Sequence, residues 1–411
     1  MAHVSMKSFA RPIVVTSACL GFRACRYNGQ NLPQRLVEAL KPHVEFRPVC
    51  PEMEIGLGVP RDPVRVVLDG GRRLLHQPAS GRDVAAEMES YCTRYLAELP
   101  PVDGFLLKSR SPSCGLKDVK VYAGLKPGAS TTRGQGLFGG AVLERFPGHP
   151  VEDEGRLLNF SIREHFLTRL FILTEFRRVR ERAAIQELID FHTRHKLLLL
   201  AYNQARMRAL GPVVAAYDKK NLQEVLERYE GHLRQALANP PKYTSMINLL
   251  THAFGGLSRD LSAEERRFFV NTVEEYRDER VPLSVPLHLL AAWAVRQGNR
   301  YLLEQSFLEP YPRPLAEITD SGKGRIPFGQ VPLDRATAYA AEDADVTLRL
   351  WLLLRPRLRE EGALALYEQV ERRMVGVLRQ MEEAGIKVDG AELARIGEDF
   401  AARLTVLEAK V

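Results

Sequence analysis

Three cysteines of this chain each stand where a short apolar run gives way to a turn that contains proline, glycine or serine. They are Cys19, Cys50 and Cys114, and the runs before them cover 13–16, 44–49 and 102–107. Thiolates are soft ligands that select iron–sulfur clusters, zinc or copper(I) over hard cations. Three of them leave one position of a cubane cluster or a tetrahedral zinc site open for substrate. The pattern predicts a three-cysteine metal site, with ordinary buried cysteines as the alternative.

The elements that must position these thiols follow from the pattern of strand and helix signals over residues 10–155. The expected elements are strands over 13–16, 44–49 and 102–107, a hairpin over 64–68 and 72–76, and helices over 32–40 and 83–99. This order predicts an α/β domain with a mainly parallel sheet. Because such sheets bind ligands beyond the carboxyl ends of their strands, we expect the three thiols to converge there.

The rest of the chain carries helical patterns. Residues 159–308 predict an all-helical domain, with apolar helical spacing over 166–179 and 184–207, a capping box from Ser262 to Glu265 and a helix stop at Phe254 to Gly256. A passage rich in proline and glycine over 309–329 predicts a linker. Helical spacing returns in 330–411, over 367–381 and 393–407, which predicts a helical C-terminal appendage.

Length and composition place the chain among ordinary globular proteins. Its 411 residues predict two or three domains, and five cysteines do not make a disulfide scaffold. No run approaches the ~18 apolar residues of a membrane span, and the first residues make a poor secretory signal, so we expect a reducing cytoplasm and no membrane partner. The net charge of +7 permits a polyanionic partner, but 58 basic against 51 acidic residues indicates nucleic-acid binding only weakly. Nothing in the sequence indicates an oligomeric state.

Several short segments in the first 155 residues together resemble the thiouracil desulfurase family. They are Ser17 to Gly21, Arg26 to Gly29, Cys50 to Glu52, Pro60 to Arg61 and Leu107 to Gly115. The resemblance implies a four-iron four-sulfur cluster bound by Cys19, Cys50 and Cys114. It also implies a desulfuration without net redox change, in which the sulfur of a thionated base such as thiouracil binds the free iron, water attacks the carbon and sulfide leaves.

Two further residues receive catalytic roles. Glu52 is placed two residues after a ligand to act as a general base or acid, and Ser111 is placed to donate a hydrogen bond or relay a proton. The alternatives are a helix-cap carboxylate for Glu52 and a turn serine for Ser111. Arg26 and Lys108 could hold an anionic substrate, although basic residues near loops need no such role.

The remaining two cysteines are less favoured as ligands at this site. Cys25 adds a thiol six residues after Cys19 and could be a spare ligand, a sulfur acceptor or a packed residue, of which packing is favoured. Cys92 lies within an amphipathic helical pattern, which predicts a core position.

The helical middle of the chain resembles an uncharacterised companion domain of such desulfurases. Its most suggestive pair is His192 and His195, three residues apart on a predicted helix. Two histidines at this spacing can share a metal ion, but no third ligand is evident, so a surface or capping role is favoured.

The C-terminal segment resembles a different family, bacterial DNA polymerase I, at the end of its proofreading exonuclease domain. The matching stretches are Ala336 to Thr347, Leu366 to Glu368 and Met381 to Asp389. The resemblance implies that Tyr339 orients a water molecule and that Asp343 holds one ion of a two-metal site. The other carboxylates of such a site and the polymerase catalytic residues are missing, so we expect a catalytically incomplete fragment. The competing hypothesis is a DNA-binding or exonuclease-related protein whose thiol domain is structural or regulatory.

Overall fold

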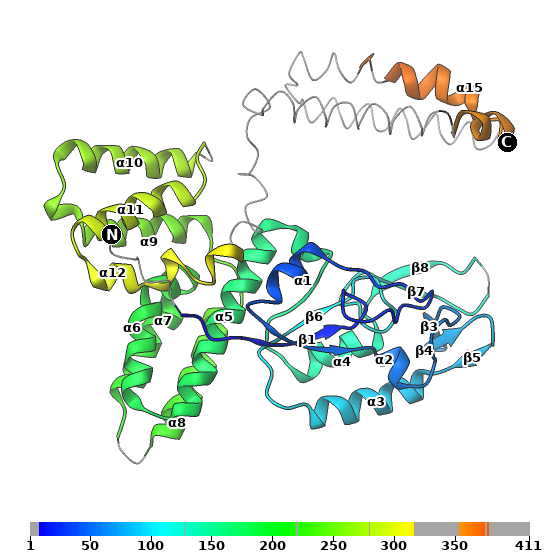
Figure 1. The fold of residues 1–411 in the computed structure, drawn as a ribbon, viewed down its shortest axis with the longest axis horizontal. Helices are drawn as coiled ribbons and strands as arrows, with labels where there is room; N and C mark the ends of the chain where they lie inside the picture. Colours follow the sequence, from blue (N-terminus) through cyan, green and yellow to red (C-terminus); the bar gives the residue numbers. More distant parts are fainter. Residues whose placement is uncertain are drawn as a thin grey trace. The chain divides into compact units, whose positions relative to one another are not determined.

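The structure is a computed structural model that describes residues 8–315, apart from 127, 219, 220 and 279, together with 352, 354–374 and 376–377. It divides into two units, residues 1–324 and residues 325–411, which are described separately. The first unit contains two sheets and a set of helices (Figure 1).

A four-stranded sheet carries the predicted cysteine strands. Its strand order is β2-β1-β6-β9, and all neighbours are parallel. The strands are β1 (Ile13–Ser17), β2 (Glu45–Val49), β6 (Gly104–Leu107) and β9 (Val151–Asp153). The prediction of a parallel sheet is confirmed, with β9 as an edge strand that the sequence analysis did not identify.

Both faces of this sheet are covered, as the continuous apolar runs of its strands require. Val15 packs in a core with helices α3 (Ala85–Glu98) and α4 (Leu137–Arg145). Val14, on the opposite face, packs with helices α1 (Arg35–Leu40) and α5 (Phe160–Arg182). The sheet therefore lies in a three-layer arrangement with its strand ends free to carry loops.

A second, five-stranded sheet was not predicted. Its order is β5-β4-β3-β7-β8, and only the β3–β7 pair is parallel. The strands are β3 (Arg65–Asp69), β4 (Arg72–Gln77), β5 (Arg82–Asp83), β7 (Val119–Tyr122) and β8 (Thr131–Gly134). The predicted hairpin is confirmed as β3 and β4, with Gly70 and Gly71 both at positive φ, as a two-residue hairpin turn requires. Strands β7 and β8 are short and half exposed, so their sequence signal is weak.

The helices of the α/β part differ in length from their predictions for local reasons. Helix α1 begins at Arg35 rather than at residue 32, because Pro33 disfavours helical backbone at the residue before it. Helix α3 buries Met88, Cys92 and Leu96 on one face, so the core position predicted for Cys92 is confirmed.

The following part is helical, as predicted. After α5 come α6 (Ile185–Tyr202), α7 (Gln204–Ala215), α8 (Leu222–Ala236), α9 (Tyr243–Gly255), α10 (Ala263–Arg277), α11 (Ser284–Arg296) and α12 (Arg300–Glu304). The capping box at Ser262 is present. The helix predicted over 184–207 is instead two helices, because Asn203 has extended backbone and its side chain caps α7.

The two parts of the first unit share a core. Leu170 of α5 packs with Val14 of β1, and Arg177 of α5 is ion-paired with Asp103 at 2.8 Å. Leu315 is fully buried in the same core. The linker predicted over 309–329 therefore differs from the structure at its start, where burial of apolar side chains holds the chain through residue 315 in the folded unit.

In the second unit, residues 354–360 are helical and are followed by α15 (Leu364–Leu366) and a π-helical turn, η5 (Tyr367–Glu371). The predicted helix over 393–407 lies outside the described residues, as do Tyr339 and Asp343. Among the helices that the structure describes, none combines the length and hydropathy needed to cross a membrane.

Candidate active site

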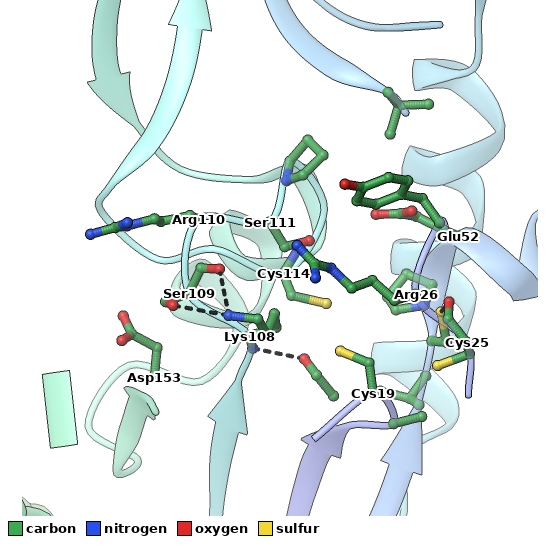
Figure 2. Close-up of a pocket in the computed structure, with 18 of the residues that line it drawn as sticks. Cys19, Cys25, Arg26, Glu52, Lys108, Ser109, Arg110, Ser111, Cys114 and Asp153 are labelled. Carbon is green, nitrogen blue, oxygen red and sulfur yellow. Dashed lines mark hydrogen bonds between the residues drawn. The ribbon is translucent and has the colours of Figure 1, made fainter. Parts of the chain in front are cut away.

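All three predicted ligands line one cavity at the carboxyl ends of the parallel strands. The cavity has a volume of about 660 Å³, and its lining includes Cys19, Cys25, Cys50, Cys114, Glu52 and Ser111. The sulfur atoms of Cys19 and Cys114 point toward one another across it (Figure 2). The volume lies within the usual range for small-molecule sites.

The parallel sheet explains why these cysteines meet. Ser17 at the end of β1 is the register partner of Val49 at the end of β2. Cys19 follows two residues after Ser17, and Cys50 follows Val49 directly and is the N-cap residue of α2 (Pro51–Glu54). Strand β6, on the other side of β1, leads into the loop that ends at Cys114.

Burial disfavours thiolate formation at two of these cysteines. It raises the pKa of Cys19 to about 11, and it raises the pKa of Cys114 well above its usual value. The pKa of Cys50 is instead lowered to about 7, chiefly by a hydrogen bond with the Cys25 thiol, which keeps its proton. Three thiolates gathered in one buried place need a cation to balance them.

Cys25 is packed against other residues and also lines the cavity. It is buried, packs with Ala18 and Cys50, and lines the cavity. The Cys50 sulfur lies 3.8 Å from the Cys25 carbonyl oxygen, which also accepts a hydrogen bond from Arg61 at 3.0 Å. The favoured packing role therefore agrees with its surroundings, but its thiol stands beside the predicted ligands.

Glu52 is held by a buried ion pair that the sequence analysis did not identify. Arg61 donates to its Oε2 atom through Nε at 2.8 Å and Nη2 at 2.5 Å, while Ser113 donates to its Oε1 atom at 2.8 Å. Both side chains of the ion pair are largely buried. Glu52 lies in the first turn of α2, but its carboxylate binds these side chains and lines the cavity.

Ser111 occupies the turn before Cys114. Its hydroxyl oxygen accepts hydrogen bonds from the backbone amides of Ser113 at 3.3 Å and Cys114 at 3.0 Å. This is the turn role that was weighed as the alternative. Because both contacts use lone pairs, the hydroxyl proton remains free to donate into the cavity that Ser111 lines.

Two glycines, Gly136 at the N-cap of α4 and Gly139 within it, let the helix approach the Cys114 loop closely, and the sequence analysis missed them. A Cβ atom at Gly139 would lie 2.6 Å from the Cys114 carbonyl oxygen, and one at Gly136 would lie 2.4 Å from the Ser113 carbonyl oxygen. Only glycine fits at such distances from backbone atoms. The Gly139–Gly140 pair would have been the available signal, but the sequence analysis predicted no helix at α4.

The two basic residues considered for an anionic substrate differ in their partners. Lys108 is ion-paired with Glu154 and donates to the Ser109 hydroxyl at 3.2 Å. Arg26 donates to the Gln30 side chain at 3.2 Å and lies over the Tyr27 ring, 5.1 Å from its centroid. Lys108 is therefore largely neutralised, whereas Arg26 faces the cavity with uncharged and aromatic partners (Figure 2).

The surface or capping role favoured for the histidine pair is wrong for His195. Its side chain is buried at 2% exposure, with Nδ1 2.8 Å from the Ser306 hydroxyl and Nε2 3.0 Å from Glu175. His192 instead contacts the Tyr229 hydroxyl at 3.0 Å. Tertiary packing buried His195 and supplied partners from distant parts of the chain.

The donor set fits an iron–sulfur cluster. Three soft thiols come from three loops around one cavity, and thiolates are the protein ligands of such clusters. No group of three or more His, Cys, Asp or Glu side chains in the described part of the chain is placed to hold a single metal ion.

The fold and the site define an α/β domain that carries a thiol-lined cavity at the carboxyl edge of a parallel sheet, joined to a helical domain. The sequence model of the 2-thiouracil desulfurase family matches residues 14–154, and that of a protein of unknown function (DUF1722) matches residues 196–312. The chain belongs to the 2-thiouracil desulfurase family, with the DUF1722 helical companion after it.

Different relatives match different parts of the chain. The uncharacterized protein YbgA of Escherichia coli is 30% identical, over 36% of this chain and 88% of that protein. A solved [4Fe-4S]-dependent thiouracil desulfidase, TudS, is 30% identical over 36% of this chain and 93% of that one, with a TM-score of 0.28.

The C-terminal part resembles DNA polymerase I. The polymerase of Rhizobium leguminosarum is 46% identical over 26% of this chain. The chain spans only 11% of the length of that polymerase.

Proposed function

We propose that this protein removes sulfur from a thionated nucleobase, such as thiouracil, at a four-iron four-sulfur cluster held by Cys19, Cys50 and Cys114. The observation that carries the proposal is the meeting of these three thiols in one cavity. When bound, such a cluster supplies an iron with an open position, a soft Lewis acid that suits the sulfur of a thiocarbonyl group. The membership in a desulfurase family agrees with this chemistry.

The chain's own residues supply proton transfer and orientation. In the balanced reaction, water contributes the carbonyl oxygen, the carbon–sulfur bond breaks and sulfide leaves, with no net transfer of electrons. Glu52 takes a proton from water at Oε1, which accepts one hydrogen bond from Ser113 and keeps a second lone pair, since Arg61 occupies Oε2. Ser111 donates its free hydroxyl proton toward the substrate or the leaving sulfur. Arg26 and Tyr27 at the cavity wall offer a cationic and an aromatic surface to the base.

We also propose a reducing compartment such as the cytoplasm, where thiols stay free to bind a cluster. All five cysteines are free in the structure, and a disulfide between Cys25 and Cys50 would remove a proposed ligand.

The test is anaerobic purification followed by iron and sulfide analysis and a visible absorption spectrum. We expect a brown protein with about four irons and four sulfides per chain. The colour should be lost in the variant Cys19→Ala, Cys50→Ala, Cys114→Ala, and retained in Cys92→Ala, which removes a buried core thiol of α3. A colourless protein that contains one zinc ion would overturn the proposal.

The second candidate is a DNA-related activity, favoured by the 46% identity to DNA polymerase I in the C-terminal part. We expect no exonuclease or polymerase activity, because the remaining carboxylates of a two-metal site are missing from the sequence. Magnesium-dependent degradation of single-stranded DNA that disappears in Asp343→Ala would establish this candidate instead.

A further inference from the structure

Asp153 is a buried acidic residue on the wall of the thiol-lined cavity. It ends the edge strand β9, and its register partner is Leu107, the last residue of β6. Asp153 therefore stands at the same carboxyl edge of the parallel sheet from which the cysteine loops leave. It is 2% exposed and lines the cavity, on the side that carries Lys108 and Ser109 (Figure 2).

One oxygen of this carboxyl group has no partner in the part of the chain that the structure describes. The backbone amide of Arg156 donates to Asp153 Oδ1 at 2.8 Å, whereas Oδ2 accepts no hydrogen bond from any described residue. The nearby cations are engaged elsewhere, because Lys108 is ion-paired with Glu154 and the Arg156 side chain with Glu152. Oδ2 is thus an acceptor on the cavity wall that the described residues leave unused.

The surroundings of Asp153 make this unused acceptor costly. Burial raises the pKa of its carboxyl group, the hydrogen bond from the Arg156 amide lowers it, and the nearby Glu154 and Asp118 raise it further. A buried polar group without a partner costs free energy, and native structures rarely leave one unsatisfied. A ligand that brings a donor into the cavity would supply the missing partner.

The other carboxylates that line the cavity already have cations. Glu52 is paired with Arg61, and Asp118 is paired with Arg110. Asp153 therefore differs from them in having an oxygen free for a ligand. The sulfur and oxygen atoms of a thionated base are acceptors, and its donors are the ring N–H groups beside the thiocarbonyl carbon. Such an N–H group is the complement of Asp153 Oδ2.

We propose that Asp153 is a specificity-determining residue for the desulfuration, whose Oδ2 atom accepts a hydrogen bond from a ring N–H group of the thionated base. This inference rests on the proposed function, because it assigns a contact to the substrate of that reaction. It restricts the substrates to thionated bases that keep the N–H at the contacted ring nitrogen. A site built around such a hydrogen bond rejects an analogue without the donor, since the buried acceptor then stays unpaired.

The test compares the full chain with Asp153→Asn and Glu152→Gln after anaerobic reconstitution of the cluster. The substrates are 2-thiouracil and its derivatives methylated at N1 or at N3. In Asp153→Asn, the Arg156 amide keeps the carboxamide oxygen at the Oδ1 position, so an NH2 group replaces Oδ2 and a donor replaces an acceptor. Glu152→Gln is the matched control, because Glu152 neighbours Asp153 on β9 and is paired with Arg156.

We expect the wild type to prefer 2-thiouracil over one of the methylated derivatives by roughly 100-fold or more in kcat/KM. Asp153→Asn should lower kcat/KM for 2-thiouracil roughly 10–100-fold, chiefly through KM, and should reduce that preference at least about tenfold. Binding of uracil, the product with the same N–H groups, should weaken by a similar factor in titration calorimetry, which needs no turnover. Iron content should stay at the wild-type level, and Glu152→Gln should behave as the wild type.

The outcomes separate this inference from the proposed function. A wild type that holds a cluster but desulfurises none of the three bases removes the proposed function and this inference together. A wild type that desulfurises 2-thiouracil and both derivatives equally overturns only the role of Asp153. An Asp153→Asn variant that is unimpaired, or equally impaired on every base, also overturns that role. If Asp153→Asn does not fold by circular dichroism, Asp153→Ala carries the same comparison.

Discussion

At the scale of single residues, the site depends on buried polar pairs that come from distant parts of the chain. Glu52 accepts from both Arg61 and Ser113, and Lys108 pairs with Glu154. Each pair satisfies a charge that would be costly to bury alone. The carboxylate proposed as the base is therefore held in one orientation before substrate arrives.

Loss of the Arg61 side chain should destabilise the protein. In Arg61→Leu, Glu52 would remain buried without its cation, which costs about 3–5 kcal/mol. Urea unfolding of the two proteins measures the difference in the free energy of unfolding. Arg110→Leu is the control, because its ion pair with Asp118 is exposed on the arginine side and should cost less than about 1 kcal/mol. Equal effects of the two substitutions would contradict the importance of burial.

Removal of the proposed base should affect turnover and not the cluster. Glu52→Gln keeps the side-chain shape but cannot take a proton, so we expect turnover of thiouracil to fall roughly 100-fold or more. Iron content per folded protein should stay at the wild-type level, while the variant should be less stable because the buried Arg61 loses its anionic partner. Glu54→Gln, an exposed substitution in the same short helix, should leave turnover unchanged. A fully active Glu52→Gln variant would leave Glu52 with a structural role only.

At the scale of elements, glycine lets helix α4 pack closely against the backbone of the Cys114 loop. A Cβ atom at Gly139 would lie 2.5 Å from the Gly115 carbonyl oxygen and 2.6 Å from that of Cys114. These neighbours are backbone atoms and cannot rotate away. The position of Cys114 is therefore set by the packing of α4 as well as by strand β6.

Gly139→Ala should push α4 away from the Cys114 loop. We expect it to cost about 1–3 kcal/mol of unfolding free energy and to lower the iron content of reconstituted protein. Gly140→Ala tests the same helix at a place where the nearest atom is a flexible one, Gln135 Oε1 at 3.1 Å. Since alanine has a higher helix propensity than glycine, Gly140→Ala should be neutral or slightly stabilising. A Gly139→Ala protein with wild-type stability and iron content would contradict this fit.

At the scale of the whole first unit, the α/β and helical parts are joined through α5, and the unit holds two half-buried histidines, His149 and His165. Burial is the main cause that lowers the pKa of His149, and likewise that of His165, to about 4. Arg234 and Arg169 lower the pKa of His149 further, while Glu230 and Asp103 oppose them.

The stability of this unit should therefore fall in acid. Both histidines are neutral when folded and take up a proton on unfolding at a pH below about 6.5. The folded pKa lies below the unfolded one, so stability is greatest above about pH 6.5 and declines as the pH falls toward 4. We expect the free energy of unfolding to fall by about 1 kcal/mol per histidine between roughly pH 7 and pH 5, a figure reduced for the partial exposure of the side chains. Urea midpoints measure this, and His149→Gln should flatten the decline; an unchanged slope would contradict its role.

The sequence alone determined the strands and loops that lead to the three proposed ligands, and the all-helical part that follows them. Apolar β-branched runs followed by Cys19, Cys50 and Cys114 predicted strands and loops in the right places, because strand and turn signals are local. Helical spacing likewise predicted the all-helical part, and the capping box at Ser262 predicted where α10 begins. The break at Asn203 was missed, since apolar spacing continues through it and only its capping side chain marks the interruption.

Only the tertiary structure decided how distant residues combine. The second sheet, the pairing of Glu52 with Arg61, the burial of His195 against Ser306 and the contact of α4 with the Cys114 loop join residues far apart in the chain. Local periodicity carries no information about which charged groups meet after folding. The meeting of the three thiols could be predicted because the carboxyl ends of parallel strands share one edge of the sheet. The residues that contact the thiols and the proposed base are instead placed by the packing of the whole unit.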